Sequence, residues 1–269
     1  MKTPPATQRL ASLGSRLRSL IEPLPWPLRI LLLLVAALPL VLIVQQVKRR
    51  RDMPIRKRTI EHSGRAEPPQ SIPREAQFNG QGERNLQTPG DGAGNFFHRR
   101  YRVDIASPKL TPEALIQEMQ TKPNGFSPVS LAVFKKTKGE EGKMEVGDEY
   151  YIHITGPWDG PVRVIEVSPT SFSFATLEGH LEAGEIIFEA TPHPDRPDAI
   201  RFEIRSWARS KDKVVDIVYD KLGMAKAAQE NMWIHFCERA LEVTEGDLIG
   251  EIEVTTEKMP YKGEEILRE

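Results

Sequence analysis

The feature that most constrains this chain is an uninterrupted apolar run over residues 30–44, which contains no polar side chain. Leu24 and Val47 extend the apolar character beyond the two ends of the run. A helix needs roughly 20 mostly apolar residues to cross the hydrocarbon core of a bilayer, and a proline such as Pro39 is tolerated in membrane helices. We therefore predict one transmembrane helix over residues 24–47, which makes the lipid bilayer the first expected partner.

Two other interpretations of the apolar run remain open. Its length also suits the hydrophobic region of a cleaved signal peptide, but no small-residue cleavage pattern follows it, and a basic block stands in that place. The run can also form a buried core helix. However, a segment that is apolar on all sides and is followed by a block of charge is unusual in a soluble core.

The basic block from Lys48 to Arg58 determines the expected orientation. It contains seven Lys or Arg residues against one Asp, and such an excess beside a membrane helix keeps that side in the cytoplasm. We predict that residues 1–23 form an external tail and that the C-terminal domain is cytoplasmic. The block can also bind anionic lipid headgroups or serve only to fix the topology. Because the neighbouring membrane already accounts for this charge, we expect no nucleic-acid partner.

Composition divides the rest of the chain into three parts. Residues 48–97 are predicted to be a basic juxtamembrane block and a flexible linker, because residues 59–97 are rich in Pro, Gly and polar side chains and have little apolar periodicity. Residues 246–269 are rich in Asp and Glu and are predicted to be an acidic tail. Residues 98–245 remain as the one predicted globular domain.

Inside residues 98–245, short runs with alternating apolar residues follow one another. Such runs are typical of strands, and short connections between them indicate an antiparallel sheet. Over residues 212–243 the apolar residues recur at helical spacing instead. We predict an α+β helix-grip domain, in which a curved antiparallel sheet surrounds a long C-terminal helix. The strand-like runs are residues 101–105, 131–136, 150–155, 162–167, 171–176, 184–190 and 199–207.

A family resemblance rests on two of these stretches. Residues 174–185 read Phe-Ala-Thr-Leu-Glu-Gly-His-Leu-Glu-Ala-Gly-Glu and are followed by Phe188, and residues 201–210 read Arg-Phe-Glu-Ile-Arg-Ser-Trp-Ala-Arg-Ser. Over about residues 101–243 the chain resembles the uncharacterised family called domain of unknown function nineteen-ninety. The resemblance implies a helix-grip fold of the START-like superfamily with a ligand-sized cavity, and it implies no known reaction. It also favours a bacterial inner membrane as the location.

Cysteine usage and motif content narrow the chemistry. The single cysteine, Cys237, excludes an intramolecular disulfide, and no base lies at a fixed offset from it, so we interpret it as an inert thiol. The sequence has no Walker loop, dinucleotide fingerprint, Cys-x-x-Cys pair or nucleophile elbow. We expect no cofactor and no metal ion.

His180 and Glu185 are the first candidate site residues. With Glu178 and Glu182 they can form an acid–base or metal site, because residues 178, 180 and 182 share one face if they lie in a strand. The alternative is a hairpin in which His180 and Glu185 fix the turn or line a pocket. In that arrangement Glu182 is a solvated charge.

Tyr151 and His153 are further candidates, and both lie on one face of the predicted strand. Tyr150, Ile152 and Ile154 lie on the opposite face. Because this second face is the more apolar, we expect it to pack on the helix. His153 is then either exposed or at the mouth of the cavity.

Glu203, Arg205 and Trp207 alternate with apolar residues on the last predicted strand. If Glu203 and Arg205 face the helix, they must pair and form a polar pocket floor, because a lone buried charge is too costly. If they face outward, they form cross-strand surface pairs. Trp233, on the long helix, completes the set of candidate ligand contacts.

Three functions are compatible with these features. The first is a membrane-anchored binding module that holds a small apolar or amphipathic ligand, such as a lipid or isoprenoid, between helix and sheet. The second is an enzyme of the same fold in which His180, Glu185 and Glu203 converge in the cavity. The third is a protein-interaction scaffold that uses the outer face of the sheet, which a contiguous exposed apolar patch would favour.

Overall fold

The computed structural model describes residue 28 and residues 53–62, 84–128, 130–154, 160–211 and 224–261. The predicted transmembrane segment over residues 24–47 lies outside these ranges except for Leu28, which is helical and exposed. Within the described ranges, no helix is both long and apolar enough to span a bilayer.

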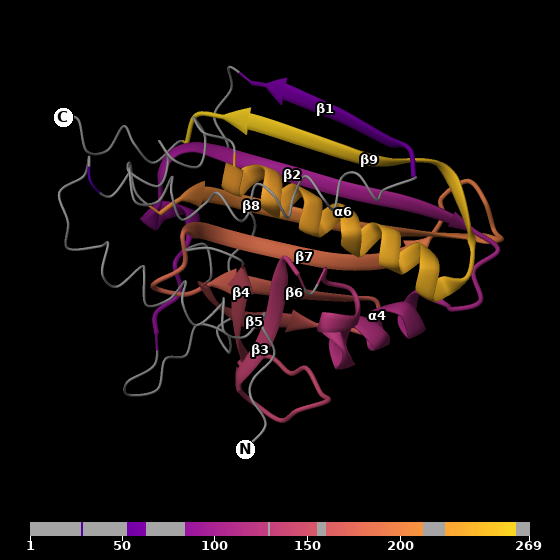
Figure 1. Ribbon diagram of the computed structural model, residues 1–269, viewed down its shortest axis with the longest axis horizontal. Coiled ribbons are helices and arrows are strands. Elements are labelled where there is room, and N and C mark those ends of the chain that lie inside the picture. The colour runs from indigo at the N-terminus through magenta and orange to yellow at the C-terminus, as the bar shows by residue number, and fades with distance from the viewer. Residues whose placement is uncertain are drawn as a thin grey trace.

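One sheet of nine strands forms the body of the described structure (Figure 1). Its strand order is β1-β9-β2-β8-β7-β6-β5-β4-β3. Neighbouring strands are antiparallel, except that β1 pairs with β9 in parallel. The strands are β1 Ile55–Glu61, β2 Ala93–Ala106, β3 Ala132–Lys138, β4 Glu149–Ile154, β5 Gly160–Val167, β6 Ser171–Thr176, β7 Glu182–Pro192, β8 Ala199–Ser210 and β9 Asp247–Met259.

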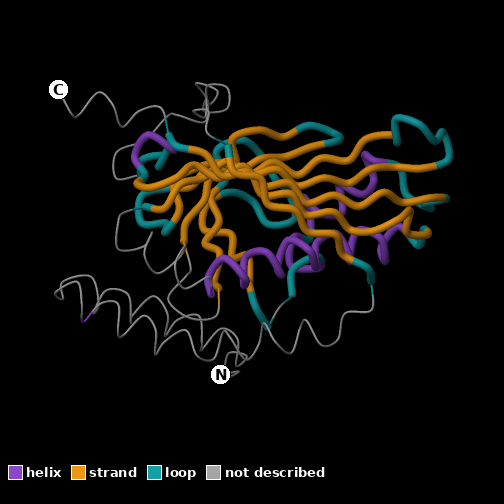
Figure 2. Tube along the Cα trace, turned by 90° about the horizontal axis from the view of Figure 1, so that it is seen from above, coloured by secondary structure: helices purple, strands orange, loops and turns teal. Residues whose placement is uncertain are grey.

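Two α-helices lie on the same side of the sheet, which we call its inner face (Figure 2). The long helix α6, Met224–Thr244, packs on β2, β8 and β9, whereas α4, Pro112–Thr121, packs mainly on β7. Thr111 caps α4 by accepting a hydrogen bond from the backbone N–H of Ala114. Two short 3-10 turns, η1 Pro89–Asp91 and η2 Pro123–Gly125, complete the elements. The predicted α+β architecture, a curved sheet with a long C-terminal helix, is confirmed, but the sheet is mixed rather than wholly antiparallel. Residues 212–223 of the predicted helix lie outside the described ranges.

Aromatic side chains fill the space between α6 and the inner face. Phe188 of β7 is fully buried, stacks on Phe172 of β6 at 4.7 Å between ring centroids, and contacts Trp233 of α6 at 5.4 Å. Phe236 of α6 lies 5.6 Å from Phe188 and 5.9 Å from Phe134 of β3. Because each of these rings removes a large apolar area from water, they contribute much of the energy that holds α6 on the sheet.

Strand β9 corrects the prediction of an acidic tail over residues 246–269. Asp247–Met259 lies between β1 and β2 in the sheet. Ile252 and Val254 are buried on the inner face, and the acidic residues alternate with them on the opposite face. Glu253, for example, forms an ion pair with Arg102 of β2. The acidic character is therefore one face of a strand with a period of two residues.

Strand β1 and the start of β2 correct the prediction of a flexible linker over residues 48–97. Ile55–Glu61 pairs with β9, and β2 begins at Ala93. Arg56 of the basic block forms an ion pair with Glu251 at 2.8 Å, and Lys57 forms one with Glu230 of α6. Part of the block, for which lipid-headgroup binding and a role in topology alone were both open, therefore binds carboxylates of the domain itself.

Candidate functional site

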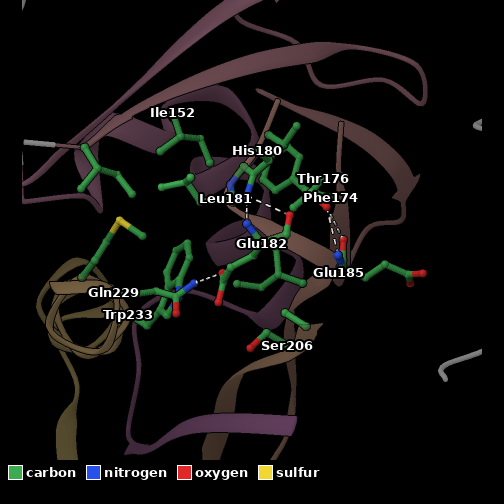
Figure 3. Close-up of a pocket in the computed structure, with 16 residues that line it drawn as sticks. Ile152, Phe174, Thr176, His180, Leu181, Glu182, Glu185, Ser206, Gln229 and Trp233 are labelled. Carbon is green, nitrogen blue, oxygen red and sulfur yellow. Dashed lines mark hydrogen bonds between the residues drawn. The ribbon is translucent and has the colours of Figure 1, made fainter. Parts of the chain in front are cut away.

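A cavity lies between the N-terminal half of α6 and the inner face of the sheet (Figure 3). Its volume is about 70 Å³, which is about half of the roughly 150 Å³ cavity that holds one benzene ring. The cavity thus has room for a few water molecules or for a small organic group. Most of its lining is apolar and includes Ile152, Val162, Phe174, Ile186, Met232 and Trp233.

A buried polar cluster borders this apolar space. Arg99 of β2 is 2% exposed and donates to Glu182 of β7 at 3.3 Å and to the side-chain oxygen of Gln229 of α6 at 3.2 Å. The amide nitrogen of Gln229 donates to the second carboxylate oxygen of Glu182 at 2.5 Å. The three side chains therefore close a ring of charge-assisted hydrogen bonds that joins helix and sheet. The structure corrects the interpretation of Glu182 as a solvated charge.

Two further polar groups in the cavity wall lack a hydrogen-bond partner among the described residues. They are the hydroxyl of Ser206, on the inner face of β8, and the indole N–H of Trp233. Both side chains are buried, with exposed fractions of 5% and 4%. Leaving a buried polar group unsatisfied costs about 1–3 kcal/mol.

His180 lies in the tight turn between β6 and β7 and lines the cavity. Its Nδ1 lies 2.9 Å from the backbone nitrogen of Glu182, which donates to it, and 3.1 Å from the backbone carbonyl oxygen of the same residue. Gln87 donates to the backbone carbonyls of His180 and Glu182, at 3.0 and 2.7 Å. Gly160 packs on the imidazole so closely that a Cβ at this position would lie 2.4 Å from Cδ2. His180 therefore both shapes the turn and borders the cavity.

The metal or acid–base arrangement of residues 178, 180 and 182 on one strand face is not formed. Residues 177–181 form the turn, and Glu178 accepts a hydrogen bond from Asn85 at 3.1 Å. Across the part of the chain that the structure describes, no three His, Cys, Asp or Glu side chains are grouped to bind a metal ion.

Glu185 borders the cavity, but its carboxylate points away from the other polar groups (Figure 3). It lies between Ala175 of β6 and Trp207 of β8 on the outer face, the face opposite the helices. Burial raises the pKa of Glu185 to about 7, because desolvation disfavours the charged carboxylate. Neutral pH is therefore where this group changes its charge.

Glu203, Arg205 and Trp207 also lie on the outer face, as strand alternation with buried Phe202 and Ile204 requires. Arg205 forms ion pairs with Glu189 at 2.7 Å and with Glu203 at 3.2 Å. Trp207 stacks on His98 of β2, with ring centroids 5.0 Å apart. The interpretation as cross-strand surface pairs is confirmed, and the polar pocket floor is not formed by these residues.

Tyr151 and His153 lie on the outer face of β4, with their rings 4.9 Å apart. Tyr150 and Ile152 are buried on the inner face, as predicted. Of the candidate residues named from the sequence, the structure brings His180, Glu182 and Trp233 to the cavity with their side chains on the helix side of the sheet, and it places Glu185 at the border.

The polar residues that sequence analysis missed are Arg99, Ser206 and Gln229. A signal for Arg99 was present. It lies at every-second-residue spacing from Phe97, Tyr101 and Val103, so it points to the same buried inner face of β2. A charged residue in the apolar phase of a strand must find a buried partner. The other two residues carry no such local signal, because their role depends on contacts across the fold.

Comparison with known proteins places the chain in a family. Residues 82–238, more than half of the chain, match the family described as Domain of unknown function (DUF1990). The chain belongs to this family. The DUF1990 match confirms the predicted resemblance and includes every residue of the polar cluster, as well as Ser206 and Trp233. Strands β1 and β9 lie outside it. No curated protein matches the sequence.

Several solved structures are similar to this DUF1990 chain at low sequence identity. A conserved protein from Geobacillus kaustophilus is 13% identical, with a TM-score of 0.36 over 57% of this chain and 99% of the other. Norcoclaurine synthase from Thalictrum flavum, in complex with dopamine and hydroxybenzaldehyde, is 13% identical, with a TM-score of 0.39 over 55% and 88%. The di-domain ARO/CYC StfQ of the steffimycin biosynthetic pathway is 12% identical, with a TM-score of 0.42 over 58% and 52%. Function is therefore argued from the cavity itself.

Proposed function

We propose that this protein is a membrane-anchored binding module that holds a small, largely apolar ligand between α6 and the inner face of the sheet. The observation that carries the proposal is a mostly apolar cavity between α6 and the sheet that is bordered by the buried polar cluster of Arg99, Glu182 and Gln229. Apolar pockets with a few convergent polar groups are the usual form of small-molecule sites. The geometry thus supports ligand binding by direct contact at a named place.

The membrane part of the proposal rests on the sequence. The apolar segment over residues 24–47 is long enough to span a bilayer. The basic excess that follows it favours an orientation with the C-terminal domain in the cytoplasm, at a bacterial inner membrane. Strand β1 begins at Ile55, soon after that segment. Such a short connection would hold the cavity close to the bilayer and to the apolar molecules dissolved in it.

An enzyme that uses His180, Glu185 and Glu203 together receives less support. Glu203 pairs in register with Glu189, four residues along β7 from Glu185, which separates the two carboxylates by about 13 Å along the strand. His180 borders the cavity on the other side of the sheet. Partners in proton transfer need hydrogen-bond reach, and these three side chains lack it.

A scaffold that uses an apolar outer face is also less well supported. In the described ranges, the large hydrophobic residues that are exposed are Leu28 and Val146. The outer face carries ion pairs instead, among them those of Arg205 and Glu253. A binding surface of the apolar kind needs a contiguous patch, which these two separate side chains do not form.

Native mass spectrometry of the full-length protein, purified in detergent from the cells that produce it, tests the proposal. We expect a small molecule to co-purify and to be lost on unfolding. Ile186→Trp, which fills the cavity from β7, should abolish this excess mass. Ile187→Trp is the matched control, because Ile187 follows in the same strand and lies on the outer face. Excess mass retained in the Ile186→Trp protein, or absent from the wild type, would contradict the proposal.

A further inference from the structure

We infer that strand β1 is a latch on the cavity: by holding the first two turns of α6 against the sheet, it keeps the cavity smaller than a ring-sized ligand requires. The inference rests on the proposed function and concerns the regulation of the same site. Three observations carry it: the small volume of the cavity, the half-buried start of α6, and an ion pair that joins this start to β1.

The volume of the cavity requires that one of its walls moves before a ring can enter. The cavity measures about 70 Å³, whereas a cavity of roughly 150 Å³ holds one benzene ring. One wall comes mainly from β4 to β8, which are consecutive in the sheet, so a strand cannot shift without breaking hydrogen bonds to its neighbours. The other wall consists of Gln229, Met232 and Trp233 of α6. A larger ligand is therefore admitted at the lowest cost by a displacement of α6.

The two parts of α6 differ in how deeply they are buried. Trp233 and Phe236 are almost fully buried and pack on aromatic rings of the sheet. In the first two turns, residues 224–230, the side chains that the structure describes are all only half-buried, and they are those of Ala227, Gln229 and Glu230. Because the burial of apolar surface supplies most of the energy that holds a helix on a sheet, the first two turns are the part of α6 that can move.

Strand β1 holds these first two turns from the edge of the sheet. Lys57 of β1 is in register with Val254 of β9, which is buried on the inner face, so Lys57 lies on the side of the helices. Its ammonium group forms an ion pair with Glu230 of α6, next to Gln229 in the cavity wall. The two side chains are 44% and 25% exposed, and exposed ion pairs are weak enough to open and close. The pair therefore suits a latch.

Strand β1 can leave the sheet without loss of the cavity. It lies at the edge, beside β9 (Figure 1), and none of its side chains is fully buried. It also lies outside the DUF1990 match, which contains every residue that lines the cavity. Residues 48–54 connect β1 to the predicted membrane segment. A change in the position of that segment would thus reach the latch through a short connection.

Two probes of different size test the inference on the full-length protein in detergent, labelled with ¹³C-methyl methionine. Xenon enters empty apolar cavities and, as a single atom, needs less space than benzene. Each probe is titrated while the methyl resonance of Met232 is followed, with concentrations referred to the aqueous phase. We expect Lys57→Met to tighten benzene binding about two- to fivefold, the range for one exposed ion pair, and to leave xenon binding unchanged. Glu230→Gln should have the same effect, and the double variant should have no larger one.

Arg56→Met is the matched control, because Arg56 precedes Lys57 in β1 but pairs with Glu251 of β9. It should leave benzene binding unchanged. The latch is overturned if Lys57→Met binds benzene no more tightly than the wild type, if Arg56→Met gives the same gain, or if none of these proteins binds benzene. In each of these cases, xenon binding still supports the cavity. If neither probe shifts Met232, the proposed function fails as well.

Hydrogen exchange of the β1 amides tests the coupling from the other direction. Coupling between two sites is reciprocal, so a ligand that displaces the start of α6 must loosen β1 by the same factor. We expect saturating benzene to accelerate exchange in β1 about two- to fivefold in the wild type and to have no such effect in the Lys57→Met protein. Equal exchange with and without bound benzene would overturn the inference.

Discussion

The inner and outer faces of the sheet are built by the same strands, yet they differ in how their polar groups are satisfied. On the outer face, Arg201 binds Asp104 at 2.7 Å, and Arg205 binds Glu189 at the same distance. On the inner face, the hydroxyl of Ser206 and the indole N–H of Trp233 are buried without a partner in the described structure. Each of these two outer-face arginines has a carboxylate partner, whereas the two inner-face groups have no hydrogen-bond partner in the described structure.

The outer face also has buried polar atoms without a partner in the described ranges, among them the hydroxyl of Ser173 and the ring of His98. Its Nε2 is buried without a partner among the described residues, and burial lowers the pKa of the ring, which disfavours the charged form. His98 stacks on Trp207 and does not line the cavity.

The largest expected difference between the faces concerns two arginines. Arg99→Met leaves Glu182 buried without its cation, which should lower the free energy of unfolding by about 3–5 kcal/mol. Arg205→Met removes a pair whose side chains are each about one-third exposed, and it should cost at most about 1 kcal/mol. Urea unfolding followed by circular dichroism measures both. Adding Glu182→Gln to Arg99→Met should recover part of the lost free energy of unfolding, because it removes the unpaired buried charge. Equal losses in the Arg99→Met and Arg205→Met proteins would contradict the predicted difference between the two faces.

A second prediction concerns Glu185 and pH. Because burial raises the pKa of Glu185 to about 7, the folded state binds more protons than the unfolded state between about pH 4.5 and 7. The contribution of this group to stability is thus fully present below that range and is lost as the pH rises through about 7. Glu185→Gln should raise the free energy of unfolding by about 2–3 kcal/mol at pH 8, relative to its effect at pH 4.

The measurement for Glu185 is a series of urea unfolding curves between pH 4 and pH 9. The quantity compared is the difference between variant and wild type at each pH, so that other titrating groups cancel. A difference that stays constant across this range would show that the carboxylate of Glu185 is solvated.

The smallest expected effect separates two buried serines. Ser127 donates to the backbone carbonyl of Ala132 at 2.8 Å, so Ser127→Ala should cost about 1 kcal/mol. Ser206→Ala removes a hydroxyl that has no partner in the described ranges, and it should leave the ligand-free protein equally stable or up to about 1 kcal/mol more stable. Thermal unfolding of both variants decides this. A clear loss in the Ser206→Ala protein would mean that the hydroxyl is satisfied in the native state.

Much of the fold was predictable because its strands alternate strongly. Phe172 and Phe174 in β6, and Phe202 and Ile204 in β8, mark the buried face at every second position, and the predicted strands there agree with the structure. β9 was missed because its acids were counted as composition, although they alternate with Ile252 and Val254. The acidic residues that predict a tail when only composition is considered form the outer face of a strand.

The site was less predictable than the fold. Arg99, Glu182 and Gln229 come from β2, β7 and α6, and their hydrogen bonds join residues 47 to 130 positions apart. No local pattern encodes such a contact. The sequence pattern pointed instead to Glu203 and Arg205, which are two residues apart in one strand and lie on its outer face.

The central claim is that an accessible apolar cavity exists on the inner face, and xenon titration of the full-length protein tests it most directly. Xenon enters empty apolar cavities and perturbs nearby methyl resonances. We predict a saturable shift of the Met232 methyl group, which lines the cavity, and no comparable shift of Met144, which is buried elsewhere. Ile186→Trp should abolish the Met232 shift. Equal responses of Met232 and Met144, or no response at Met232, would contradict the account.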